Sequence, residues 1–169
     1  MKNAISLAIV VVALTAGGAM AQHGGQQHSL QGQQAAKACI DEFNAVVGEG
    51  RGFGLAFVAD QNGYPGPMHV LELKDRLKLT ADQEAKTSAL YAAVRAELPK
   101  STRLLEAERK LERLFAERTA SESAVRAAAA EVEHARTEVR LVHLLAHVRT
   151  RDLLTEEQRR IYHEARWAR

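Results

Sequence analysis

One short motif occurs twice in this chain, and each copy constrains the local fold. Leu79–Gln83 reads LTADQ and Leu154–Gln158 reads LTEEQ. Threonine precedes glutamine by three residues, the spacing of a capping box: the hydroxyl accepts from the glutamine N–H, and the glutamine side chain reaches back to the threonine N–H. The preceding leucine can pack on the first turn. Each motif therefore predicts a sharp helix start, capped by Thr80 with Gln83 and by Thr155 with Gln158.

Residues 1–21 have the layout of a secretory signal peptide. Lys2 supplies a positive charge, Leu7–Thr15 is an apolar run, and Ala19–Ala21 is a small-residue cleavage site. The run is short for a membrane-spanning helix, so we expect cleavage, a periplasmic protein and no membrane insertion afterwards; retention as an anchor is the alternative. The single cysteine, Cys39, cannot form an intrachain disulfide. Packing, a partner chain or a metal must then hold the fold.

Composition favours long helices and argues against several functions. Charged residues make up 26% and aromatic residues 5% of the chain, and the second half is dense in Ala, Glu, Arg and Leu. A net charge of +2, mixed in sign along the chain, gives no basis for binding nucleic acid or an anionic membrane. The sequence has no nucleophile motif in a strand-turn-helix context and no phosphate-binding glycine loop after a strand. We therefore expect a protein that is not an enzyme.

The part of the chain before the first motif divides into three segments. Residues 22–34 are rich in Gln, Gly and His without a hydrophobic period, which predicts a flexible tail. Residues 35–47 have apolar positions at helical spacing, which predicts a short amphipathic helix. Residues 48–66 are rich in Gly and Pro, which predicts a linker or a wrapping loop.

Residues 67–169 predict an all-α domain of four helices. A short helix near 68–78 precedes the first motif, Pro99 must kink or interrupt the long helix that follows, and a third capping box at Thr119–Glu122 marks a turn. The next long helix carries a seam with alternating spacings of three and four. A short helix follows the second motif. The fold class is therefore a bent antiparallel hairpin of two long helices flanked by two short ones. The seam residues are Val125, Ala128, Val132, Ala135, Val139, Val142 and Ala146.

The seam consists of small side chains, which favours a dimer over a lone hairpin. Alanine and valine allow close helix approach but bury little apolar area. A lone hairpin would be weakly stabilised, so we expect a homodimer in which a second chain covers exposed apolar stripes.

The two LTxxQ motifs, the signal peptide and the four-helix order together resemble the LTxxQ-motif family of periplasmic proteins. That family includes Spy/CpxP-like chaperones and periplasmic heavy-metal sensors. Residues 63–73, GYPGPMHVLEL, resemble the heavy-metal-sensor branch in particular. The resemblance implies a bent helical hairpin, often dimerised into a cradle, that binds metal ions, unfolded clients or an envelope signalling partner.

Four side chains are candidate metal ligands. His143 and His147 are four residues apart on a helix and project from one face, and His69 and Glu72 form a second pair three apart. Folding the chain at its two corners brings both pairs to the level of residues 91–96, at about 1.5 Å per helical residue. Three nitrogens and a carboxylate would suit Zn, Ni, Co or Cu.

Simpler readings of these residues stay open. His143 and His147 could be solvated or hydrogen-bonded beside the seam, and His69 and Glu72 could cap a first turn. Weaker candidates, mostly expected to be exposed, are His23, His28, His134, His163 and Cys39. Two functional classes remain: a metal-binding sensor of the cell envelope, and an ATP-independent chaperone that shields unfolded clients on an apolar helical face.

Overall fold

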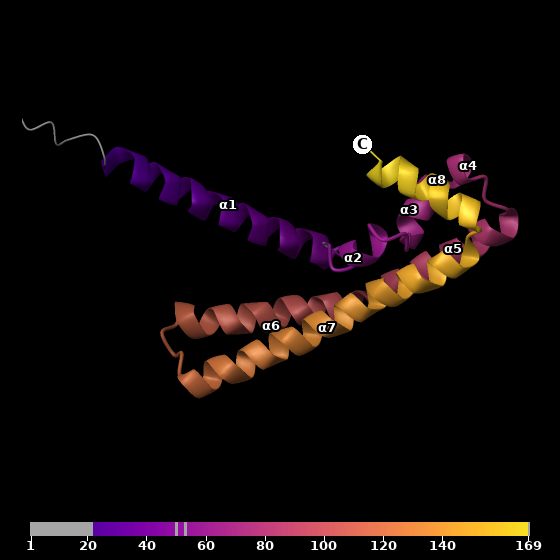
Figure 1. Ribbon diagram of the computed structural model, residues 1–169. Coiled ribbons are helices and arrows are strands. Elements are labelled where there is room, and N and C mark those ends of the chain that lie inside the picture. Colours follow the sequence, from indigo (N-terminus) through magenta and orange to yellow (C-terminus); the bar gives the residue numbers. More distant parts are fainter. Residues whose placement is uncertain (1–21, 50, 53, 169) are drawn as a thin grey trace, which may run out of the picture. The chain divides into compact units, whose positions relative to one another are not determined.

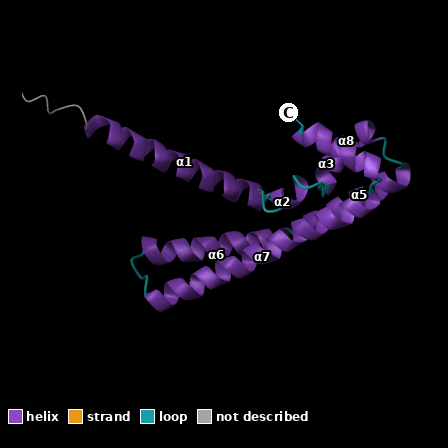
Figure 2. Cartoon of the chain, in the orientation of Figure 1, coloured by secondary structure: helices purple, strands orange, loops and turns teal. Residues whose placement is uncertain are grey.

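The computed structural model describes residues 22–49, 51–52 and 54–168, so the predicted signal peptide lies outside the described residues. The chain divides into two compact units, Met1–Cys39 and Ile40–Arg169. Helices joined by turns and loops account for the described residues, as Figure 2 shows, which confirms the all-α prediction. None of the described helices is long and apolar enough to cross a membrane.

The segment before the Gly/Pro-rich stretch differs from its prediction. Helix α1 covers Gln22–Gly48, so the expected tail at residues 22–34 is helical and continuous with the expected short helix. Glutamine and alanine have good helix propensity, and this lets a segment without an apolar face adopt helical backbone. Residues 31–40 are all exposed, so packing contributes little to this part of α1. The last turns, from Ile40, belong to the second unit.

The second unit is built on a long antiparallel hairpin. Helices α5 (Ala81–Ala96) and α6 (Leu98–Ala116) run in succession along α7 (Glu122–Leu153), as Figure 1 shows. Pro99 lies in the first turn of α6, where its missing N–H costs no helical hydrogen bond. The predicted interruption at Pro99 is therefore confirmed. The seam is confirmed as well, since its residues are buried or half-buried along α7.

The turn between α6 and α7 corrects the third capping box. The cap of α7 is Ser121, whose hydroxyl accepts from the Ala124 N–H at 3.2 Å. Thr119 instead lies in the turn, its hydroxyl 3.5 Å from the Leu114 carbonyl. Thr119 and Ser121 are both cap-forming residues two positions apart, and the tight turn after α6 places the second of them at the helix start.

Four short helices cover the open end of the hairpin. These are α2 (Phe57–Asp60), α3 (Pro67–Glu72), α4 (Lys74–Leu77) and α8 (Glu156–Trp167). Helices α3, α4 and α8 build a small core with the end of α7, while a second core joins the end of α1 to α6 and α7. The Gly/Pro-rich stretch is thus a packed wrapping loop that contains α2. The two sets of buried residues are Val70, Leu77, Leu154 and Tyr162, and Val47, Leu104, Leu105, Ala107, Val132 and Val139.

The two LTxxQ motifs meet at this end of the hairpin. Both capping boxes are present, with Thr80 and Thr155 as caps. The glutamine of each box also binds the other: Gln83 Nε2 donates to Gln158 Oε1 at 2.8 Å, and Gln158 Nε2 donates to Gln83 Oε1 at 3.0 Å.

Further bonds complete this glutamine clasp. Gln83 Nε2 donates to the Leu153 carbonyl at 2.9 Å, and Gln158 Nε2 donates to the Leu77 carbonyl at 3.2 Å. Each Oε1 also accepts from the N–H of its own threonine at 3.0 Å. Both hydrogens and both acceptor positions of each amide are used. The clasp therefore joins the corner before α5 to the corner before α8.

We expect Gln158→Ala to lower the free energy of unfolding by about 1–3 kcal/mol, because it removes a buried amide, two of the four hydrogen bonds of the Gln83 amide and the bond to the Leu77 carbonyl. Urea denaturation followed by far-UV circular dichroism measures the change. Gln34→Ala, at an exposed position of α1, is the matched control. Equal denaturation midpoints for the two variants would contradict a structural role for the clasp.

The homodimer stays a prediction, and the structure indicates where to test it. Leu141, Leu145 and Val148 are 45%, 47% and 38% exposed and share one face of α7. We expect Leu145→Glu to convert a dimer to a monomer in sedimentation velocity, with Phe115→Glu at the far end of the hairpin as the control. A wild-type chain that already sediments as a monomer would exclude this dimer.

Candidate functional site

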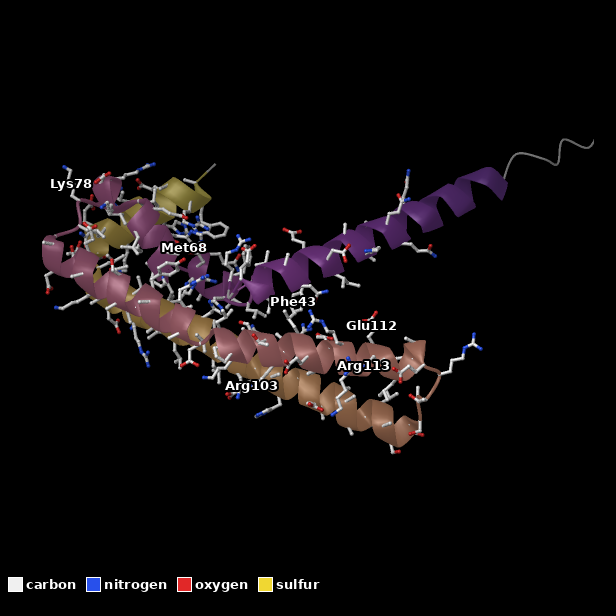
Figure 3. The ribbon with its side chains drawn as sticks, turned by 180° about the vertical axis from the view of Figure 1, so that it is seen from behind. Phe43, Met68, Lys78, Arg103, Glu112 and Arg113 are labelled. Atoms are coloured by element: carbon white, nitrogen blue, oxygen red, sulfur yellow. The ribbon has the colours of Figure 1, made fainter. Side chains whose placement is uncertain are left out.

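A cavity of about 490 Å³ lies beneath the wrapping loop. Its walls come from α5, α7, α8, the end of α1 and residues 51–69; Met68, labelled in Figure 3, belongs to it. Three of the four predicted ligands line this cavity: His69, His143 and His147. So do Tyr91, Val94 and Arg95, the level predicted from the two corners.

His143 and His147 of α7 each pack against a glycine of the wrapping loop. A methyl group at Gly52 would lie 3.0 Å from Cγ of His143, and one at Gly66 would lie 2.9 Å from Nε2 of His147. A side chain at either position would displace the loop or the imidazole. The two glycines therefore let backbone approach the rings directly.

Hydrogen bonds set the tautomers of two imidazoles. His147 Nδ1 lies 2.6 Å from the Tyr64 carbonyl, which can only accept, so Nδ1 carries the hydrogen. His69 Nδ1 lies 2.9 Å from Glu72 Oε2, a carboxylate that accepts in the same way. In the neutral form of either ring, Nε2 then keeps its lone pair, the form in which histidine ligates a metal.

Burial favours the neutral form of His143 and His147. Desolvation lowers the pKa of His143, and the neighbouring His147 lowers it further. Desolvation also lowers the pKa of His147, against the Tyr64 carbonyl and Asp60, which favour its charged form. Neutral imidazoles are the form needed for ligation near pH 7.

The fourth predicted ligand lies differently. Glu72 does not line the cavity, its side chain is 57% exposed, and its carboxylate contacts His69. Within the part of the chain that the structure describes, no group of three or more His, Cys, Asp or Glu side chains is arranged to hold a metal ion. The three imidazoles thus share a cavity wall without forming a coordination sphere in this arrangement.

Of the weaker candidates, the side chains of His23 and His28 lie outside what the structure describes. His134 and His163 are exposed on α7 and α8, and Cys39 is an exposed free thiol. None of the three lines the cavity.

Sequence reasoning missed a buried polar cluster beside the histidines. Asp60 is 6% exposed and accepts from the Tyr162 hydroxyl at 2.5 Å and from Arg166 at 3.1 and 3.2 Å. Burial and the Asp60 carboxylate raise the pKa of Tyr162. Asp60 falls in a stretch with no periodic pattern, so its burial has no local signal; the spacing of Tyr162 and Arg166, one helical turn apart, was a signal that the two share a face.

Comparison with known proteins gives a family match for most of the second unit. The model of a protein family described as "LTXXQ motif family protein" matches residues 67–166. The chain belongs to the LTXXQ motif family. The matched region of this LTXXQ protein starts at α3 and ends within α8, so it includes both halves of the glutamine clasp and the histidines of the cavity. Neither curated proteins nor solved structures gave a match.

The lowered pKa values of His143 and His147 make a testable link to stability. An unfolded histidine takes up its proton as the pH falls through about 6.5, whereas the folded imidazoles resist protonation to lower pH. Their contribution to the free energy of unfolding is therefore present above about pH 6.5 and is lost as the pH falls to their folded pKa values.

We expect a double His143→Gln, His147→Gln variant to lose less stability than wild type between about pH 8 and about pH 5, measured by urea denaturation at each pH. A double His134→Gln, His163→Gln variant controls for exposed histidines. If the wild-type and cavity-variant curves run parallel, the two imidazoles do not carry this pH dependence.

Proposed function

We propose that this LTXXQ protein is an exported, metal-responsive sensor protein that binds a divalent transition metal at the cavity wall. His69, His143 and His147 are the proposed ligands. The observation that carries the proposal is that three imidazoles from α3 and α7 line one cavity. In His69 and His147, Nδ1 is hydrogen-bonded, which leaves Nε2 as the nitrogen for ligating a metal. Glu72 then orients His69 instead of binding the ion itself.

The donor set defines the class of ion. Neutral imidazoles suit Zn, Ni, Co and Cu, and they bind Mg or Ca poorly because those ions prefer oxygen ligands. A divalent ion would supply a crosslink between α3 and α7 at this position. The proposed role is binding and signalling within the cell envelope rather than catalysis, with export directed by residues 1–21 and an envelope signalling partner downstream.

The test is a titration of the mature chain with Zn, Ni, Co and Cu salts by isothermal calorimetry. We expect stoichiometric binding by at least one ion, a rise in the thermal midpoint with ion concentration, and at least a tenfold loss of affinity in His143→Ala, His147→Ala. His134→Ala, His163→Ala removes two exposed histidines from α7 and α8 and serves as the control. Equal affinities in the two double variants would exclude the proposed ligands.

A chaperone is the second candidate, and exposed apolar side chains favour it. Phe57 and Val58 on α2 are 51% and 49% exposed, and Leu141, Leu145 and Val148 expose a stripe of α7. Such surface could hold apolar segments of unfolded clients. Suppression of client aggregation that needs no metal and survives His143→Ala, His147→Ala would favour this function over sensing.

A further inference from the structure

Residues 60–67, which we name the strap, contact both α7 and α8, and Asp60, Gly66 and Pro67 of the strap line the cavity. The strap connects α2 to α3 and contains Pro65, Gly66 and Pro67, all buried. The strap contacts α7 through Tyr64. The Tyr64 carbonyl accepts from His147 Nδ1. The Tyr64 ring lies 4.8 Å from the guanidinium of Arg151, which is one turn further along α7. The strap is thus attached to α7 at two points.

On its other side the strap is attached to α8. Asp60 accepts from Tyr162 and Arg166, and the Gly66 backbone lies near the Tyr162 hydroxyl. Tyr162 is fully buried, so its hydroxyl depends on Asp60 of the strap for its hydrogen bond. Gly66 therefore lies between His147 and Tyr162.

The position of Gly66 limits access to His147. The nitrogen of His147 that could ligate a metal is Nε2. The Gly66 backbone approaches it so closely that a methyl group added at Gly66 would lie 2.9 Å from Nε2. A metal bound to imidazole lies about 2.0–2.1 Å from the nitrogen and needs space for its remaining ligands. Gly66 occupies part of that space.

We propose that the strap is a displaceable cover: His147 can bind an ion only when Gly66 moves away from Nε2, and this movement loosens the attachment of the strap to α8 through Tyr162 and Asp60. The inference rests on the proposed metal-binding function and adds its regulation. Part of the binding free energy is spent on displacing the strap, so the strap lowers the apparent affinity. The part of the molecule that changes on binding is then the contact between α2, the strap and α8.

The chain carries its own reporter of that contact. Trp167 is its single tryptophan and lies on α8 beside Arg166. The indole ring lies edge-on to Phe57 of α2, with the ring centroids 5.3 Å apart. Movement of α2 against α8 would change the surroundings of the indole, so tryptophan emission reports a change in this contact.

The experiment combines Zn²⁺ calorimetry with Trp167 emission for wild type and two strap variants. Tyr162→Phe removes the hydroxyl but keeps the buried ring, and Asp60→Asn weakens the pairing with Arg166 at equal size. We expect both variants to bind Zn²⁺ about 3- to 10-fold more tightly than wild type, because displacing the strap costs less. Wild-type emission should change on binding. Asp75→Asn on exposed α4 is the matched control and should bind as wild type.

The outcomes separate the strap from the metal site. Tighter binding in either folded strap variant, with an emission change in wild type, supports the inference. Stoichiometric Zn²⁺ binding at wild-type affinity in both folded strap variants overturns it and leaves the proposed function standing. Absence of Zn, Ni, Co and Cu binding in wild type and in both variants overturns the proposed function and the strap with it. Circular dichroism establishes that each variant is folded.

Discussion

The reciprocal hydrogen bonding of Gln83 and Gln158 is the interaction on which the rest of the structure depends. Each amide closes its own helix cap and binds the other motif, so two corners some seventy-five residues apart in sequence are joined by a saturated polar cluster. This sets the register of α5 against α7. The register in turn places His143 and His147 at the level of Tyr91 and Arg95. The position of the cavity thus follows from two side chains at one end of the hairpin.

Local rules in the sequence predicted much of this fold. The caps at Thr80 and Thr155, the break at Pro99 and the α7 seam each follow from spacing or from the chemistry of one residue. The common level of His69, His143 and His147 could also be predicted, because helical rise converts sequence distance into length. Where the sequence has no hydrophobic period, the prediction was weaker: the helical backbone of residues 22–34 was missed, and the glycine-rich stretch could be predicted only as a linker or a wrapping loop.

The contacts that set the burial and tautomers of the cavity side chains could not be predicted from the sequence. Asp60 is buried because distant Tyr162 and Arg166 satisfy it, and no local pattern encodes partners a hundred residues away. The imidazole tautomers depend on the Tyr64 carbonyl and on the rotamer of Glu72. Gly52 and Gly66 read as loop residues, whereas their structural role is contact with imidazole rings. Such roles arise only when tertiary structure brings non-local groups together.

The break at Pro99 gives the hairpin a mechanical asymmetry. One arm consists of two helices meeting at Glu97, whereas α7 passes the same level as an unbroken rod of 32 residues. Glu97, Lys100 and Ser101 at the joint border the same small pocket as His143. The joint between α5 and α6 therefore lies next to a cavity histidine. A change in the bend at this joint would therefore shift the surroundings of His143 while leaving α7 continuous.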